Sequence, residues 1–129
     1  MRLMSFALTT EQMLARTKTV TRRLGWRSLK PGTLLQAVEK AMGLGKGGNV
    51  RRLGVIRVLS VRRERLDEMV GTEYGDAEAV REGYPEHSGE QFAEMFAQRL
   101  AVVRECLSDV EVTRIEFEHV DDAAAGDIS

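Results

Sequence analysis

Residues 51–66, RRLGVIRVLSVRRERL, constrain the fold of this chain more than any other segment. Apolar and polar side chains alternate along them, and a period of two predicts one long β-strand. The strand is expected to present its apolar residues on two faces, with Val55, Leu59 and Val61 on one and Ile56 and Val58 on the other. The fold therefore includes a β-sheet, and the remaining segments indicate what surrounds this strand.

The segments before the long strand predict two or three further strands and one short helix. Residues 3–8, LMSFAL, are typical of a strand that enters the core. Thr9 and Gln12 have the spacing of a capping box, which predicts a helix of about two turns. The β-branched residues after Lys18 favour a strand over continued helix. Residues 33–42 fit either a helix or a buried strand, and we prefer the strand.

After the long strand, the sequence predicts two helices and a last strand. The first helix runs from about Asp76 to Glu82 and ends where a glycine and then a proline follow. The second begins at Ser88, with Gln91 in capping-box spacing, and continues as a stripe of core-facing residues. The apolar members of that stripe are Phe92, Met95, Phe96, Leu100, Val103 and Leu107. Residues 111–120 alternate as a strand.

These elements predict an α+β domain over residues 1–120. An antiparallel or mixed sheet is expected to curl into a small β-barrel with flanking helices. Residues 121–129, DDAAAGDIS, hold nothing that a core could bury, and we expect a disordered tail there.

The charged residues are balanced in number but not in position. The chain has 19 lysines and arginines against 20 aspartates and glutamates, a formal net charge of -1. Residues 16–30 nevertheless hold six basic side chains and no acid. One basic patch on a neutral molecule suits a small anionic ligand or a short strand better than a long duplex, which a basic domain usually holds.

The sequence predicts no metal, no cofactor and no membrane contact. Cys106 is the only cysteine, which excludes an intrachain disulfide, and no Cys/His cluster has metal-ligand spacing. The first residues lack the long apolar core of a signal peptide, and no run approaches the ~18 apolar residues of a membrane span. We therefore expect a cytoplasmic protein.

Three short motifs give the chain a resemblance to a known family. TKTVTRR follows the first predicted helix, KPGTLLQ comes next, and TRIEFEHV closes the domain. Together they resemble the ASCH domain, a branch of the PUA-like β-barrel superfamily, over nearly the whole chain up to Val120. Two positions depart from the family pattern. Arg16 stands where a glycine is usual, which would alter the cleft mouth, and Thr33 replaces a frequent aspartate in the turn.

The resemblance implies a barrel with a cleft for RNA, a nucleotide or a modified base. One small bacterial branch that this sequence resembles hydrolyses the amide of N4-acylated cytidines with a lysine, a threonine and a glutamate. Lys18 and Thr21 match the first two within KTVT, and Glu82 aligns with the glutamate. Arg23 matches the arginine that follows the threonine by two places.

An amide hydrolase would give each of these residues a role. Thr21 would supply the nucleophilic hydroxyl, and Lys18 would act as base if burial or nearby cations lower its pKa toward neutrality. Glu82 would orient Lys18 or the substrate amine. Residues three apart on a regular strand point to opposite faces, so Lys18 has to lie in the loop before the strand, or a bulge has to separate it from Thr21. Alternatively, Lys18 and the arginines around it form a solvated edge.

Other candidate residues leave alternatives open. A carboxylate in the last turn of a helix opposes the macrodipole at a cost of ~0.3–1 kcal/mol, so Glu82 either pairs with a group such as Lys18 or is exposed at a frayed end. Trp26 and Tyr84 are candidates to stack on a base, although a lone tryptophan is more often a core residue. Arg22 is a further candidate ligand contact.

Two remaining motifs carry weaker signals. GLGKGGN, residues 43–49, fits no phosphate-loop motif and is interpreted as a mobile hairpin tip whose Lys46 can reach a phosphate. His87 and His119 are too widely separated to suggest a pair, and His119 is interpreted as structural.

Three functional hypotheses follow from these observations. The first is a module that binds RNA or a modified nucleoside in a basic cleft, with Lys18, Thr21, Arg23 and Glu82 as contacts. The second is a metal-independent amidohydrolase that deacylates N4-acylcytidine-type nucleosides with Lys18, Thr21 and Glu82. The third, a ribonuclease, lacks the histidine pair that would support it.

Overall fold

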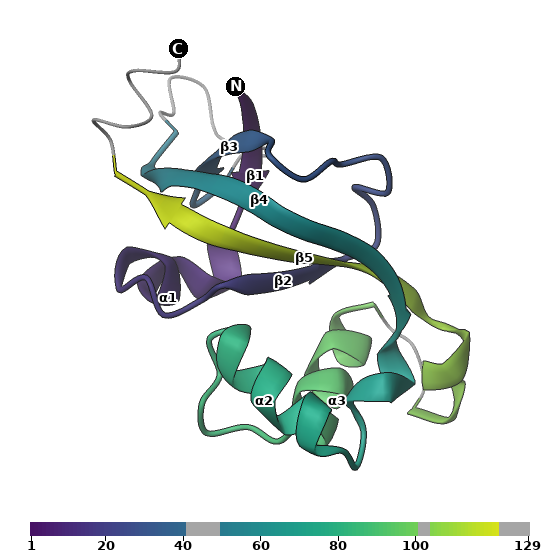
Figure 1. The fold of residues 1–129 in the computed structure, drawn as a ribbon. Coiled ribbons are helices and arrows are strands. Elements are labelled where there is room, and N and C mark those ends of the chain that lie inside the picture. Colours follow the sequence, from purple (N-terminus) through teal and green to yellow (C-terminus); the bar gives the residue numbers. More distant parts are fainter. Residues whose placement is uncertain (41–49, 101–103, 122–129) are drawn as a thin grey trace.

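The computed structural model describes residues 1–40, 50–100 and 104–121. One sheet in these residues has the strand order β1-β3-β4-β5-β2 (Figure 1). Its strands are β1 (Arg2–Ser5), β2 (Val20–Arg23), β3 (Leu34–Val38), β4 (Arg52–Arg65) and β5 (Glu111–Val120). β1 runs parallel to β3, and the other neighbours are antiparallel. The predicted α+β class with a small, curled, mixed sheet and flanking helices is confirmed, and so is the preference for a strand within residues 33–42.

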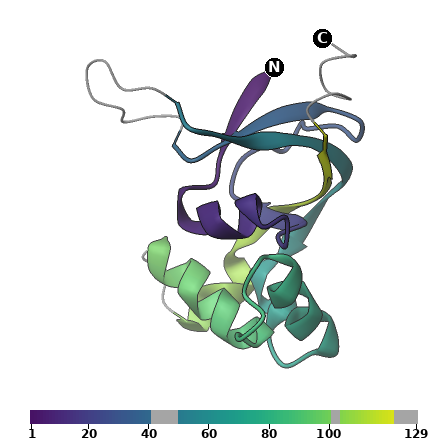
Figure 2. The same cartoon turned by 90° about the vertical axis from the view of Figure 1, so that its left-hand side faces the viewer.

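The helices gather at the β2 side of the sheet (Figures 1 and 2). They are α1 (Thr10–Leu14), α2 (Glu73–Arg81) and α3 (Gly89–Arg99), with short 3-10 helices η1 (Ala7–Thr9), η2 (Leu66–Met69) and η3 (Arg104–Asp109). Both helices predicted after the long strand are present. The predicted stripe is wrong in its length, because α3 ends at Arg99 and Leu107 lies in η3.

β4 is the predicted long strand, but a bulge changes which of its side chains share a face. The pairing of β4 with β5 shifts register around Leu59, and that side chain is exposed. A bulge adds one residue to a strand and therefore reverses the alternation beyond it. Val61 consequently packs in the same core as Ile56 and Val58. The predicted shared face of Val55, Leu59 and Val61 is wrong.

The two predicted capping boxes have different outcomes. At α3, Gln91 N donates to Ser88 Oγ at 3.1 Å and Ser88 N donates to Gln91 Oε1 at 2.8 Å, which confirms the box. At α1, the Thr9 side chain makes no capping bond, and the helix continues directly from η1. The Gln12 side chain instead donates to the carbonyl oxygen of Gly83 at 3.2 Å. This bond ties α1 to the segment that follows α2.

The buried apolar side chains form two main cores. The larger one fills the curl of the sheet and consists of Met4, Phe6, Met13, Leu29, Leu35, Ala37, Leu53, Ile56, Val58, Ile115 and Phe117. The other lies among the helices and consists of Leu66, Met69, Ala79, Phe92, Ala93, Ala97 and Leu107. α2 meets the sheet through charged side chains, since Glu78 pairs with Arg22 of β2 and Arg114 of β5. The junction of the two cores is therefore polar.

Several predictions fall on parts of the chain that are not described. These are the hairpin tip at 43–49 with Lys46, the stripe residue Val103, and the tail beyond Asp121. In the described part, no helix combines the length and the apolar character needed to cross a bilayer.

Candidate functional site

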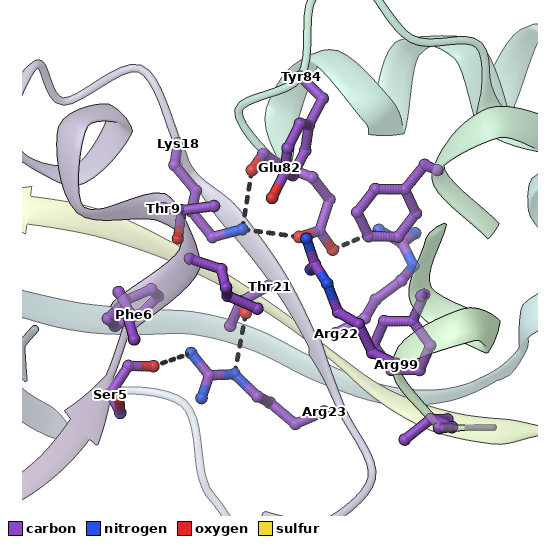
Figure 3. Close-up of a pocket in the computed structure, with 15 residues that line it drawn as sticks. Ser5, Phe6, Thr9, Lys18, Thr21, Arg22, Arg23, Glu82, Tyr84 and Arg99 are labelled. Carbon is purple, nitrogen blue, oxygen red and sulfur yellow. Dashed lines mark hydrogen bonds and ion pairs between the residues drawn. The ribbon is translucent and has the colours of Figure 1, made fainter. Parts of the chain in front are cut away.

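A pocket of about 290 Å³ lies where the two cores meet (Figure 3). One wall comes from the end of β1, from η1 and from β2, and the other comes from the end of α2 and from α3. Its aromatic lining residues are Phe6, Tyr84, Phe92 and Phe96, and its charged or hydroxyl lining residues include Thr9, Lys18, Thr21, Arg22, Arg23, Glu82 and Arg99. The fold thus brings Lys18, Thr21, Arg23, Glu82 and Tyr84 together, as the sequence motifs led us to expect.

Lys18 lies in the loop immediately before β2, which is one of the two predicted arrangements, loop or bulge, that allow Lys18 and Thr21 to line the same pocket. The residue is only 3% exposed. Its Nζ donates to Glu82 Oε1 at 2.7 Å and to the Glu82 carbonyl oxygen at 2.8 Å. An ammonium group has three N–H donors, so among the described residues one donor of Lys18 is left for a ligand.

The backbone around Lys18 is held from two sides. His119 Nε2 on β5 lies 2.7 Å from the Lys18 carbonyl oxygen, and Thr19 N donates to the Arg81 carbonyl oxygen at 2.8 Å. A carbonyl oxygen can only accept, so Nε2 of His119 carries the hydrogen. Burial lowers the pKa of His119, although the hydrogen bond to the Lys18 carbonyl oxygen acts against this. The loop is fixed to the sheet by His119 and to α2 by Thr19.

Glu82 caps the C-terminus of α2 and is 2% exposed. Besides Lys18, it accepts from Arg22 Nη1 at 3.1 Å. Of the two alternatives for Glu82, the structure shows the ion pair with Lys18. Gly83 follows with a φ of +98°, and a Cβ atom there would lie 2.8 Å from Gln12 Cγ and 3.5 Å from Lys18 Cβ. Glycine is needed at this position because the backbone is left-handed and because α1 and Lys18 pack against it.

The surroundings of Lys18 lower its pKa. Burial is the largest cause, because it disfavours the ammonium form, and Arg23 and Arg22 act in the same direction. Glu82 opposes them by stabilising the ammonium form. The direction of the net change is the one that a lysine base requires.

The proposed role of Arg22 as a ligand contact does not agree with its surroundings. Its side chain has no exposure, and its three nitrogens bond to three carboxylates: Nε to Glu64 at 2.7 Å, Nη2 to Glu78 at 2.6 Å and Nη1 to Glu82 at 3.1 Å. The charge of Arg22 is satisfied inside the protein. Arg22 forms part of the pocket wall and holds Glu82 in place from the sheet.

Glu78 is a residue of this network that the sequence reasoning missed. It is fully buried and accepts from Arg114 Nε at 2.5 Å, from Arg22, and from Arg81 at 2.8 Å. Burial alone would raise the pKa of Glu78, but the hydrogen bonds from Arg114, Arg81 and Arg22 lower it to about 2. The four-residue spacing of Glu78 and Glu82, which puts both carboxylates on one face of a helix, is the signal that would have found it.

Arg23 links Thr21 to the opposite edge of the sheet. Its Nε donates to Thr21 Oγ1 at 3.0 Å, and its Nη2 donates to the Ser5 carbonyl oxygen at 2.6 Å. The guanidinium also lies 4.7 Å from the centre of the Phe6 ring. Burial lowers the pKa of Arg23 to about 10, although Glu82 acts against this. Arg23 therefore spans β1 and β2, the two ends of the strand order, at the pocket.

The two aromatic candidates lie in different places. Tyr84 lines the pocket and packs against Phe92 and His87, with ring centres 5.9 Å and 5.4 Å away. Trp26 does not line the pocket. It packs against the core of the sheet, with the Arg2 guanidinium 4.1 Å from its ring centre. Trp26 is therefore partly buried, and the structure does not bring it to the other candidate ligand contacts.

The pocket also contains residues that the sequence patterns assigned to the core or left unmentioned. Phe92 and Phe96 were expected only to face the core, and Phe6 and Arg99 were not singled out. Phe92, Phe96 and Arg99 have the spacing of one face of α3, whereas Phe6 precedes η1 and reaches the same pocket only through the fold. Among the residues that the structure describes, no group of three or more His, Cys, Asp or Glu side chains is placed to hold a metal ion.

Comparison with known proteins gives matches in structure alone. No family model matches the sequence, and no curated protein matches it significantly. The hypothetical protein PH0355 is similar with a TM-score of 0.59 and 18% identity, over 92% of this chain and 97% of that one. A protein of Enterococcus faecalis with the family model DUF984 has a TM-score of 0.56 and 17% identity, over 93% and 80%. An ASCH domain from Lactobacillus crispatus has a TM-score of 0.56 and 16% identity, over 92% and 78%.

Proposed function

We propose that this chain, which has an ASCH-type fold, binds a nucleoside-type small molecule in the pocket lined by Lys18, Thr21 and Glu82. The observation that carries the proposal is the buried Lys18–Glu82 pair at a pocket with aromatic walls. A nucleobase offers flat faces that pack on aromatic rings and an edge of hydrogen-bond donors and acceptors. The free N–H of Lys18 and the hydroxyl of Thr21 suit the acceptors on that edge.

The size of the pocket favours a single nucleoside over an RNA strand. Its volume of about 290 Å³ lies just below the ~300–1,000 Å³ typical of small-molecule sites. Single-stranded RNA is usually bound along a groove that tracks the backbone over ~4–16 nucleotides. A compact pocket at the junction of two cores fits one modified nucleoside better.

Calorimetric titration with cytidine and with N4-acetylcytidine tests the binding proposal. We expect the wild-type protein to bind at least one of them and Thr21→Val to weaken binding roughly tenfold, because a hydrogen bond to a buried group is lost. Thr33→Val is the matched control, since Thr33 lies outside the pocket and its hydroxyl donates to the Lys30 carbonyl oxygen. Absence of binding by both nucleosides, or equal affinities for the two variants, would refute the proposal.

Amide hydrolysis is the second candidate function, and the chemistry around Lys18 and Thr21 favours it. Burial lowers the pKa of Lys18, and the Arg23 Nε–H that donates to Thr21 Oγ1 would stabilise a developing alkoxide. In this reaction Thr21 Oγ1 attacks the acyl carbon, and its proton passes to the uncharged amine form of Lys18, which the lowered pKa favours. Lys18 then returns the proton to the leaving N4 nitrogen as the C–N bond breaks. Water hydrolyses the resulting Thr21 ester, which releases the acid.

Incubation with N4-acetylcytidine, followed by chromatography for cytidine and acetate, tests this second candidate. We expect release of both products from the wild-type protein and none from Thr21→Val or Lys18→Met. Binding of N4-acetylcytidine without any release would reject hydrolysis of this compound and leave the binding proposal standing.

A further inference from the structure

Two of the arginines that line the pocket have no carboxylate partner among the described residues. Arg23 donates only to neutral oxygens, those of Thr21 and Ser5. Arg99, the last residue of α3, is exposed and lines the pocket from the helical wall. Its side chain extends from α3 into the pocket (Figure 3).

The other cations of the pocket are neutralised inside the protein. Lys18 pairs with Glu82, and Arg22 pairs with Glu64, Glu78 and Glu82. The positive charge that the pocket offers to a ligand is therefore that of Arg23 and Arg99. Burial of the Arg23 guanidinium without a counter-ion costs free energy, and an anionic ligand would offset that cost.

The contacts of Arg23 also have a structural explanation, because the side chain ties β1 to β2 and lies over Phe6. That explanation does not extend to Arg99, which reaches the same pocket from a different element. A planar guanidinium donates two parallel hydrogen bonds to a phosphate or carboxylate group, so this is the chemistry that such a pair recognises.

We infer that the ligand of this pocket carries an oxyanion, which Arg99 and Arg23 bind while its base lies beside Lys18 and Thr21. This inference rests on the proposed nucleoside-type ligand and narrows it. The oxyanion is either the phosphate of a nucleotide or a carboxylate on the acyl substituent of a modified base.

Calorimetric titration with cytidine, cytidine 5′-monophosphate and N4-succinylcytidine tests the inference and distinguishes the two sources. We expect one of the anionic compounds to bind at least about tenfold more tightly than cytidine, and that compound identifies the source. Arg99→Gln should reduce the affinity for the anionic compound about tenfold more than it reduces the affinity for cytidine. Arg27→Gln is the control, because Arg27 is exposed, lies outside the pocket and carries the same charge.

The possible outcomes separate this inference from the proposed function. If cytidine binds as tightly as both anionic compounds, the oxyanion site is rejected and the nucleoside pocket stands. If Arg99→Gln and Arg27→Gln reduce the affinity for the anionic compound equally, the effect comes from net charge and the assignment to Arg99 is wrong. If none of the three compounds binds, both proposals fail.

Discussion

At the scale of single residues, the site depends on charges that are buried and shared. The Glu82 carboxylate accepts hydrogen bonds from Lys18 at 2.7 Å and from Arg22 at 3.1 Å, and the Glu78 carboxylate accepts hydrogen bonds from three arginines. Breaking such a buried pair by removing one partner typically costs ~3–5 kcal/mol, because the other charge is left uncompensated. The network therefore has to be complete for the pocket wall to hold its shape.

The carboxylate of Glu78 should make the stability of the fold fall in acid. Its pKa is about 2 in the folded protein against an ordinary value of 4.5. Because the unfolded chain binds this proton more tightly, the stabilisation is fully present above the ordinary pKa and is lost as the pH falls through about 2. The difference corresponds to a free energy on the order of 3 kcal/mol.

Chemical denaturation at about pH 7 and about pH 3 measures this effect. We expect Glu78→Gln to be less stable than wild type at the higher pH. Between the higher and the lower pH, this variant should lose less stability than wild type does. Glu73→Gln removes an exposed carboxylate from the same helix and should retain the wild-type pH dependence. An equal loss in Glu78→Gln and wild type would show that Glu78 does not carry the acid sensitivity.

At the scale of elements, the end of α2 organises the site. The last residues of this helix and the turn after it present Glu82 and Tyr84 to the pocket. The same segment receives hydrogen bonds from Thr19 and from Gln12 of α1. One helix terminus thus sets the position of the loop that carries Lys18.

Substitution of Gly83 by alanine should disturb both stability and binding. A Cβ atom on this left-handed backbone would lie 2.8 Å from Gln12 Cγ, so we expect a loss of about 1–3 kcal/mol in the free energy of unfolding and weaker nucleoside binding. Gly25→Ala is the matched control, because nothing lies within 4 Å of its Cβ position and its φ is not left-handed. Thermal unfolding and calorimetry measure the two effects, and wild-type behaviour of Gly83→Ala would contradict this account of the turn.

At the scale of the whole molecule, the basic run of residues 16–30 does not form a continuous basic surface. Lys18 and Arg22 are buried, and both form ion pairs with the glutamate that caps α2. Arg22 also pairs with one glutamate of β4 and one of α2. Arg16 pairs with Asp121 at 3.3 Å. Folding thus neutralises much of the charge that the sequence concentrates there. The formal net charge of -1 adds no general attraction for phosphates.

We therefore expect weak binding of single-stranded RNA. Titration with a labelled oligonucleotide at about 0.15 M salt should give an affinity no tighter than the ~10⁻⁴–10⁻⁶ M of non-specific binding. Lys30→Gln and Arg27→Gln change exposed residues of the basic run and should reduce this weak affinity for the oligonucleotide further. Tight binding that Thr21→Val abolishes would instead assign the pocket to RNA.

Local patterns in the sequence were sufficient to predict most of the elements. Alternation predicted β4 and β5, the Ser88–Gln91 spacing predicted the start of α3, and the glycine before the proline predicted the end of α2. Each of these signals depends on residues within about one turn or one strand of each other, where backbone preference decides the conformation. The motif around Lys18 and Thr21 likewise placed both residues in one pocket, with Lys18 in a loop.

Only the tertiary structure decided what each charged or aromatic side chain contacts. The carboxylate partners of Arg22 lie 42, 56 and 60 residues away in the sequence, so no local pattern could show that its charge is already satisfied. The bulge at Leu59 arises from pairing with β5, and the pocket forms where two separate cores meet. Backbone propensity acts over a few residues, whereas burial and ion pairing depend on which distant segments the fold brings together.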